Sequence, residues 1–352
     1  MTAAIERARE LVMEFGWNST SYQILNPGID LWFGESAKAV IGYTRRHGVL
    51  LVAGAPICPL AKLEQVCGEF EIFAKARRCS VCYVCAEDRL RSFFAERSDH
   101  STVALGAQPA WNPQEWPDLV AGHSSLRAQL HRSLNKSVRV EEMPTAEGRA
   151  NAEIRDILHD WLSSRGLPPL HFLTEPHLLA GVVQDRVLLV ARRDARIVAF
   201  LVTSPIPAKQ GFMVELLARS REAPNGVSEL LIDAAMRRFA AKHFQYGTLG
   251  LVALAHASDR EIQRNPIWLQ WMMRFARAHA NRFYNFRGLE QFRVKMRPQR
   301  WETLYAISNE RRFSLRTLYS VGSAFSGIPP WMAIGIGAMK ALGEEFRRLL
   351  PA

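Results

Sequence analysis

Apolar residues in the first half of the chain follow strand spacing in some blocks and helix spacing in others. A turn at Arg46, His47 and Gly48 separates two apolar runs, which predicts a hairpin. Later blocks alternate between buried strands and amphipathic helices. The predicted order is a hairpin (39–57), a helix (60–78), a strand (79–87), a helix (87–97), a strand (102–111), a helix (124–136), a strand (138–143) and a helix (145–165).

The second half repeats this scheme. A hairpin turns near Asp194, Ala195 and Arg196, and a strong amphipathic helix begins near residue 227. A helix from residue 266 is expected to lead into a strand that starts near residue 286. The predicted order is a hairpin (186–207), a strand (211–219), a helix (227–244), a strand (246–254) and a helix (266–280).

Each half therefore has the order hairpin, strand, loop, helix, strand, which resembles that of the GCN5-related N-acetyltransferase fold. We expect an α/β (α+β) fold of two tandem modules of this type, each a mixed twisted sheet flanked by helices. The predicted boundaries are residues 1–145 for the first module, residues 146–312 for the second and residues 313–352 for a helical tail. The tail is partly amphipathic, so it is expected to pack on the second module, lie on a membrane or contact a second copy.

The composition is that of a globular protein with a basic surface. Hydrophobic residues make up 48% of the chain, charged residues 22%, and the formal net charge is +11. This excess favours a nucleic acid, an anionic membrane or a phosphorylated ligand as partner, although a generally basic protein is the plain alternative. With no signal peptide or run of about 20 apolar residues, we expect a cytoplasmic protein, peripheral to the inner face of the membrane if it binds lipid.

Five cysteines, Cys58, Cys67, Cys79, Cys82 and Cys85, are expected to be reduced and buried. The strand pattern sends Cys82 and Cys85 to opposite faces, and no histidine completes a zinc set nearby. Neither a metal nor another cofactor is expected.

The connection between residues 211–219 and the helix from residue 227 has the form of a phosphate-binding loop without its usual glycines. Glu215 is an unexpected carboxylate on an apolar strand, and is interpreted either as a base or amino-group clamp, or as a half-exposed strand residue. Asn225 and Gly226 favour a turn with positive φ, and Ser228 is available as a helix cap. The loop either binds an anion or is a plain connection between strand and helix.

Several stretches together resemble the C-terminal domain of the aminoacyl-phosphatidylglycerol synthases, from about residue 20 to residue 310. The clearest are GAQPAWNPQEW, LRAQLHRSLNKSVRVEE, VELLARSREAPNGVSELLIDAAMR and NRFYNFRGLEQFRVKMRPQRWETLYA. The resemblance implies transfer of an amino acid from aminoacyl-tRNA, the co-substrate, to the hydroxyl of a lipid such as phosphatidylglycerol. It places the active site in the second module. The chain departs from the family at Ala55, where an acid is frequent, at Arg293, where a lysine is frequent, and in showing no multi-span flippase segment.

The resemblance also implies roles for particular side chains. The expected catalytic residues are Glu215, Asp233 and Lys295, although Asp233 would also suit the helix dipole. Substrate binding is expected from Arg219, Asn225, Gly226, Tyr284, Asn285 and Arg297, and contact with tRNA from Arg127, Arg132, Lys136 and Arg139. The alternatives are a core strand around Phe283, Phe286 and Phe292 and a solvated cationic helix face. His171 is interpreted as a satisfied core histidine, with a role in proton transfer as the alternative.

Three other functions remain open from the sequence. A soluble small-molecule acceptor would keep the same tRNA donor, and is favoured by the missing flippase segment. An acyl-CoA N-acyltransferase is disfavoured because its usual Q/R-x-x-G-x-G/A loop is lacking. A tRNA- or lipid-binding module without catalysis is the last alternative.

Overall fold

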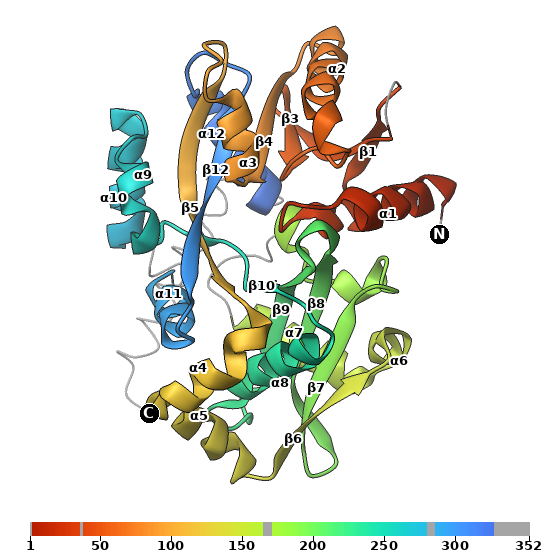
Figure 1. The fold of residues 1–352 in the computed structure, drawn as a ribbon, viewed down its shortest axis with the longest axis vertical. Coiled ribbons are helices and arrows are strands. Elements are labelled where there is room, and N and C mark those ends of the chain that lie inside the picture. Colours follow the sequence, from red (N-terminus) through yellow and green to blue (C-terminus); the bar gives the residue numbers. More distant parts are fainter. Residues whose placement is uncertain (1, 36–37, 165–170, 280–285, 327–352) are drawn as a thin grey trace, which may run out of the picture.

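In the computed structural model, one mixed sheet runs through the described residues, which are 2–35, 38–164, 171–279 and 286–326 (Figure 1). Along the sheet the strands are β1 (Asp30–Phe33), β2 (Val40–Arg46), β3 (Val49–Ala53), β4 (Ser80–Ala86), β12 (Arg300–Ser308), β5 (Ser101–Trp111), β10 (Tyr246–Thr248), β9 (Gly211–Arg219), β8 (Arg196–Ile206), β7 (Val187–Arg193) and β6 (Val138–Met143). A short strand, β11 (Val252–Ala253), pairs separately with β5. The predicted residues Tyr284 and Asn285 lie outside the described range.

Helices cover both faces of this sheet (Figure 1). They are α1 (Ala3–Phe15), α2 (Leu63–Ala76), α3 (Asp88–Phe94), α4 (Trp116–Gly122), α5 (Ser124–Leu134), α6 (Thr145–Ala150), α7 (Ala152–Ser163), α8 (Val227–Ala241), α9 (Asp259–Ile262), α10 (Ile267–His279), α11 (Phe286–Lys295) and α12 (Leu315–Ser326). In the second half, α8 packs with α5 on one face, and α7 packs on β8 and β9 from the other. Each face thereby buries its own apolar cluster.

The two halves repeat one arrangement of strands, as the sequence predicted. In each half an antiparallel hairpin leads to a strand that pairs in parallel with the next one, β3 with β4 and β9 with β10. The connecting helices of these parallel pairs are α2 and α8. The turns fall where expected, with positive φ at His47, Gly48 and Asp194. The mixed α/β fold of two acetyltransferase-like modules is therefore confirmed.

Strand β12 connects distant parts of the chain. It lies between β4 and β5 and is antiparallel to both. Its residues fall within the range predicted for the second module, whereas both of its neighbours fall within the first. The boundary at residue 145 stays a prediction, but it does not separate two independent sheets.

Three local expectations differ from the structure. The residues from Phe286 to Lys295 form helix α11 instead of a strand. Phe292 on this helix and Met296 just after it pack in the cluster around α8. The strand expected over residues 246–254 is split into β10 and β11. The described helix of the tail, α12, packs on β2 and β3 of the first half as well as on the 3₁₀ turn Phe172–Thr174, which falls in the range predicted for the second module.

The five cysteines are free and buried, as expected. Burial raises the pKa of Cys58 to about 12, and that of Cys85 to about 12 as well, so both stay thiols. Cys82 and Cys85 do not point to opposite faces: both join one core cluster, because Cys85 has a φ of 61° that breaks the strand alternation. Among the described residues, no group of three or more His, Cys, Asp or Glu could hold a metal ion.

Candidate functional site

A cavity of about 520 Å³ lies beside α11, the start of α5 and the 3₁₀ turn His256–Ser258. It brings together two of the predicted residues, Lys295 and Arg297. Its lining consists of Ser125, His256, Glu290, Gln291, Val294, Lys295 and Arg297. We call this lining the α11 pocket. Its volume is in the range of small-molecule sites.

Lys295 is the last residue of α11, and Pro298 follows it closely, which favours the end of the helix there. Its Nζ atom donates to Oε1 of Glu229 at 2.7 Å. Glu229 lies in the first turn of α8, with a side chain only 8% exposed, whereas that of Lys295 is 37% exposed. Because an ammonium group has three donors, this ion pair fixes Lys295 while leaving donors for a ligand.

Arg297 adds a second cation to the pocket. Its backbone has a φ of 53°, and its carbonyl accepts a hydrogen bond of 3.2 Å from Nε1 of the buried Trp111, which anchors the main chain. Within the described ranges, its guanidinium makes no hydrogen bond or ion pair with protein. Ser125 lies in the first turn of α5, where backbone N–H groups lack partners inside the helix. Two cations and a helix start thus make this pocket suited to an anion.

His256 is a pocket residue that the sequence reasoning missed. Its Nδ1 atom lies 2.8 Å from Oε2 of Glu290, and its backbone N–H donates to the other oxygen of Glu290 at 2.7 Å. A carboxylate that holds one ring nitrogen orients the imidazole and leaves the second nitrogen for proton transfer. The available signal was a histidine directly after an apolar strand, since functional residues often lie in such loops.

The turn at Asn225 and Gly226 is shaped by packing against α5. Gly226 has a φ of 95°, and a Cβ there would lie 2.2 Å from the carbonyl oxygen of Gln129. The Ser133 hydroxyl donates to the Asn225 carbonyl at 3.2 Å. Gly226 itself occupies the N-cap position of α8, so the expected cap at Ser228 is wrong. Within this structure, Asn225 and Gly226 are engaged in forming the turn.

Glu215 is neither half-exposed nor free. It is the extra residue of a β-bulge in β9, because Val214 and Leu216 face consecutive residues of β8. Its carboxylate receives two bonds from Arg186, at 2.8 and 3.1 Å, and the two side chains are 3% and 0% exposed. Arg186 also donates to Asn26 at 2.7 Å, so the pair joins the N-terminal segment to the second half. This geometry favours a structural role over a base.

Asp233 is also held by protein groups. Its Oδ1 atom accepts from Nε1 of Trp116 at 2.8 Å, and Arg237 donates to both carboxylate oxygens at 3.0 and 2.9 Å. It ties α4 to α8 and does not line the α11 pocket.

The predicted tRNA-binding cations continue along and beyond α5 from the pocket. Arg132, Lys136 and Arg139 are exposed, as is Arg219 at the end of β9. Arg127 differs, because its guanidinium donates to the Val120 carbonyl at 3.3 Å and to that of Ala121. It is partly committed to capping α4.

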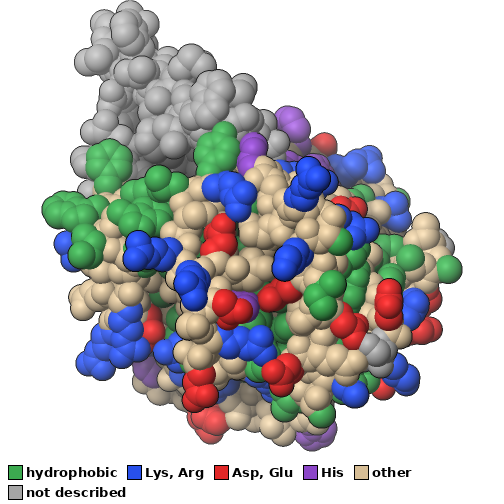
Figure 2. Space-filling model, turned by 90° about the horizontal axis from the view of Figure 1, so that it is seen from above, with side chains coloured by type: hydrophobic (Ala, Val, Ile, Leu, Met, Phe, Trp, Pro, Cys, Tyr) green, Lys and Arg blue, Asp and Glu red, His purple; other side chains and the backbone are tan. Residues whose placement is uncertain are grey.

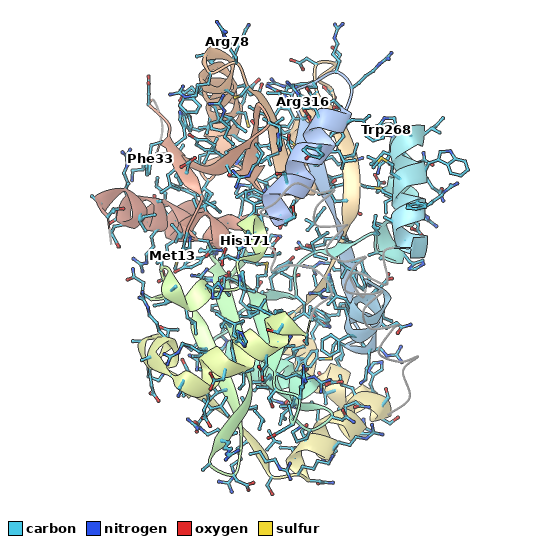
Figure 3. All side chains as sticks on the ribbon, turned by 180° about the vertical axis from the view of Figure 1, so that it is seen from behind. Met13, Phe33, Arg78, His171, Trp268 and Arg316 are labelled. Atoms are coloured by element: carbon cyan, nitrogen blue, oxygen red, sulfur yellow. The ribbon has the colours of Figure 1, made fainter. Side chains whose placement is uncertain are left out.

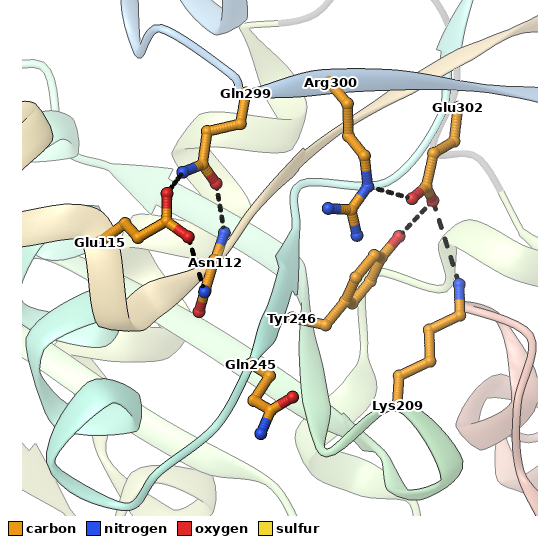
Figure 4. Close-up of a pocket in the computed structure, with 8 residues that line it drawn as sticks. All are labelled: Asn112, Glu115, Lys209, Gln245, Tyr246, Gln299, Arg300 and Glu302. Atoms are coloured by element: carbon orange, nitrogen blue, oxygen red, sulfur yellow. Dashed lines mark hydrogen bonds and ion pairs between the residues drawn. The ribbon is translucent and has the colours of Figure 1, made fainter.

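A second cavity, of about 640 Å³, lies where the two halves meet (Figure 4). Its lining is Asn112, Glu115, Lys209, Gln245, Tyr246, Gln299, Arg300 and Glu302. Glu302 accepts from Tyr246 at 2.6 Å and from Arg300 at 2.8 Å, and it pairs with Lys209 at 3.9 Å. Burial, together with the charges of Glu87 and Glu302, raises the pKa of Tyr246. Most charged groups here already satisfy one another, so the cavity suits a ligand less well than the α11 pocket does.

The parallel pair of the first half ends against the N-terminal segment. A Cβ at Gly54, which follows β3, would lie 2.2 Å from Oγ1 of Thr20 and 2.6 Å from Nδ2 of Asn18. Asn18 also donates to the Cys85 carbonyl at 3.1 Å and accepts from the Glu87 N–H at 3.2 Å. The place where β3 and β4 end is thus filled by protein. In the second half, the carbonyl of Leu249, directly after β10, accepts a hydrogen bond from the Arg293 guanidinium. Arg293 lies on α11, the helix beside the candidate pocket.

His171 is not a core histidine. Its side chain is 45% exposed, its Nδ1 atom lies 3.0 Å from Oε2 of Glu175, and its backbone N–H donates to the Phe325 carbonyl at 2.8 Å. Figure 3 places it between the two halves, away from Trp268 on α10. Its contacts join α12 to the 3₁₀ turn Phe172–Thr174.

Comparison with known proteins agrees with this fold. The family model for phosphatidylglycerol lysyltransferase, C-terminal, matches residues 9–308. A phosphatidylglycerol lysyltransferase of Staphylococcus haemolyticus is 18% identical over 311 residues, which cover 86% of this chain and 35% of that protein. The chain therefore spans about a third of the length of this curated relative.

Two solved structures share the architecture. L-PGS from Bacillus licheniformis has a TM-score of 0.70 and 19% identity, covering 95% of each chain. The C-terminal domain of a predicted lysylphosphatidylglycerol synthetase from Agrobacterium fabrum has a TM-score of 0.73 and 19% identity, covering 92% of this chain and 97% of that one. The chain belongs to the family of phosphatidylglycerol lysyltransferase C-terminal domains.

Proposed function

We propose that this chain transfers an amino acid from aminoacyl-tRNA to a hydroxyl of phosphatidylglycerol, with the reaction centred on the α11 pocket. The observation that carries the proposal is the meeting of Lys295 and Arg297 at the start of α5. A charged tRNA end and a phospholipid headgroup both present phosphate, and cations at a helix start are suited to bind it. The name of the matched family supports the lipid acceptor.

In this proposal the acceptor stem of the tRNA follows α5. The exposed side chains of Arg132, Lys136 and Arg139 would contact its phosphates, and the 3′ end would enter at Ser125. The net charge of +11 supports a polyanionic donor.

The proposed reaction is attack of a lipid hydroxyl on the ester carbonyl of the aminoacyl group. A new C–O bond forms, and the bond to the tRNA ribose oxygen breaks. His256, oriented by Glu290, would take the hydroxyl proton and return it to the leaving ribose oxygen. Lys295 would stabilise the negative charge on the carbonyl oxygen in the tetrahedral intermediate. No net oxidation occurs, and no cofactor is needed.

A soluble acceptor remains the second candidate, because the same pocket chemistry would serve any hydroxyl or amine. Within the described ranges, no helix is long and apolar enough to cross a bilayer. We propose that the chain reaches a lipid acceptor from the cytoplasmic side as a peripheral protein.

The deciding experiment supplies a radiolabelled mixture of aminoacyl-tRNAs together with phosphatidylglycerol vesicles. The expected result is label in the organic phase, lost in the Lys295→Ala and His256→Gln variants and kept in Lys75→Ala, an exposed lysine on α2. Label that appears only in a water-soluble product after addition of cell extract would select the soluble acceptor. Tight acetyl-CoA binding with no effect of tRNA would overturn both.

A further inference from the structure

Helix α10 carries a stripe of large apolar side chains on its outer face. Ile267 is 74% exposed, Trp271 66% and Phe275 67%, and these three residues follow one another at intervals of four. Met272, 47% exposed, widens the stripe. We call Ile267, Trp271, Met272 and Phe275 the α10 stripe.

The opposite face of α10 holds the helix on the protein. Leu269 is 1% exposed in the core cluster of the first half, and Trp268 and Met273 pack partly against buried clusters. Near the C-terminal end of the helix, Arg277 donates to Asp259 and to the Leu254 carbonyl, both at 2.7 Å. The orientation of α10 is thus fixed, and the stripe faces outward.

Among the described residues, the other large exposed apolar side chains form no stripe of this length, although Leu315 and Tyr319 of α12, 64% and 36% exposed, make a pair one turn apart. Leu60, Ile72 and Leu134, for example, come from separate elements. Figure 2 shows hydrophobic side chains gathered at the left edge of the upper face, the side on which Figure 1 places α10. Monomeric proteins seldom expose such a patch without a binding role.

The charges around the stripe are suited to an anionic surface. The α10 sequence, IWLQWMMRFARAH, contains no acidic residue. Arg274 is exposed with its guanidinium 5.9 Å from the Trp271 ring. Arg264 before the helix is 69% exposed and pairs with Glu261 at 2.8 Å. Aromatic and aliphatic side chains beside arginines are typical of helices that lie at a membrane surface.

The position of α10 relative to the α11 pocket agrees with this role. The bonds from Arg277 to Leu254 and Asp259 hold α10 against the segment that contains His256. Val294, 50% exposed, lies on the lining of the same pocket. A bilayer at α10 would therefore bring lipid headgroups to the side of the protein on which the pocket lies.

We propose that the α10 stripe docks on an anionic phospholipid bilayer, with Trp271 and Ile267 entering the boundary between headgroups and acyl chains. The proposal rests on the lipid acceptor of the proposed function and adds the surface that delivers the enzyme to it. Apolar burial supplies the attraction, and Arg274 makes it selective for anionic lipid.

The test is flotation of the full chain with vesicles of phosphatidylglycerol and phosphatidylcholine in equal parts. The Ile267→Ser/Trp271→Ser variant is expected to bind about tenfold less than the unaltered chain. An Ile72→Ser variant, altered at a comparably exposed position on α2, should bind normally. Circular dichroism and melting temperature should be unchanged in both, because the substituted side chains are exposed.

Normal vesicle binding by the double variant would overturn the proposal. Sedimentation that shows a dimer for the unaltered chain and a monomer for the double variant would also overturn it, because the stripe would then be an interface between copies of the chain. Transfer to a water-soluble, short-chain phosphatidylglycerol separates the two proposals. If the double variant retains this transfer but loses transfer to vesicles, docking is supported. If the unaltered chain binds vesicles through α10 but modifies neither lipid, the proposed function fails while docking stands.

Discussion

The Nζ atom of Lys295 lies 2.7 Å from Oε1 of Glu229, so the last residue of α11 is bonded to the first turn of α8. A carboxylate at this end of α8 is favoured by the helix dipole, and it holds the ammonium group at the wall of the α11 pocket. The pair therefore positions a cation with donors to spare beside Arg297.

Replacing Lys295 with alanine is expected to slow aminoacyl transfer by about 100-fold or more, the usual cost of removing a donor to a developing oxyanion. Single-turnover rates with saturating aminoacyl-tRNA measure the chemical step. Lys295→Arg should restore part of the rate because it keeps the charge and the donors. An unchanged rate in Lys295→Ala would remove this residue from the site.

Replacing Glu215 with glutamine is expected to destabilise the fold by about 3–5 kcal/mol, because Arg186 would keep a buried charge without its partner. Urea unfolding measures the change. A double variant, Arg186→Met/Glu215→Leu, should recover most of the lost stability. If the Glu215→Gln variant has the same free energy of unfolding as the unaltered protein but does not catalyse transfer, the carboxylate acts in catalysis.

Replacing Gly226 with alanine is expected to cost about 1–3 kcal/mol, because φ is 95° and the new Cβ would clash with the Gln129 carbonyl. Gly68, inside α2, offers a control of opposite sign, since no atom lies within 4 Å of a Cβ there. Gly68→Ala should stabilise the protein by about 0.5–1 kcal/mol. Equal effects at both positions in thermal unfolding would contradict the proposed shaping of the turn.

Stability should fall as the pH rises above 6.5, the ordinary pKa of histidine, through a contribution from His100. Burial opposes protonation of its ring, but bonds to Glu71 at 3.0 Å and to Asp99 at 2.8 Å raise the pKa of His100 overall. The folded state therefore binds this proton more tightly than the unfolded state does. The stabilisation is complete below pH 6.5 and is lost as the pH passes the raised pKa. His100→Gln should flatten this part of the stability profile measured by urea unfolding.

Binding of tRNA should weaken steeply with salt, and Arg132→Ala/Lys136→Ala should make that dependence shallower. Each lost phosphate contact reduces the slope of log affinity against log salt by about 0.7–0.9. Filter binding over a range of salt concentrations measures both slopes. Lys75→Ala serves as the control, and an identical slope in the double variant would place the tRNA elsewhere.

Much of the fold could be predicted because local signals set it. The turns at His47 and Asp194 follow from short polar breaks between apolar runs, and the parallel pairs follow from the intervening helices. Helix α11 was mistaken for a strand because its aromatic residues, Phe286 and Phe292 among them, suggest core positions without fixing the period.

The candidate site was predictable only in part. Lys295 and Arg297, both predicted, line the α11 pocket, whereas Glu215 does not, although a carboxylate on an apolar strand had suggested it. Its partner Arg186 lies 29 residues away in the chain, and no local pattern records such a pairing. His256 was missed for a similar reason, because its orientation depends on Glu290, 34 residues later.

The insertion of β12 between β4 and β5 has a consequence during synthesis. The facing edges of β4 and β5 stay without their partner until residues 300–308 have left the ribosome. At about 5–20 residues per second, the interval from residue 111 to residue 300 lasts roughly 10–40 s. Unpaired strand edges attract other chains, so the nascent protein needs protection for that time. A nonsense codon shortly before residue 300 would remove the central strand of the half that was translated first.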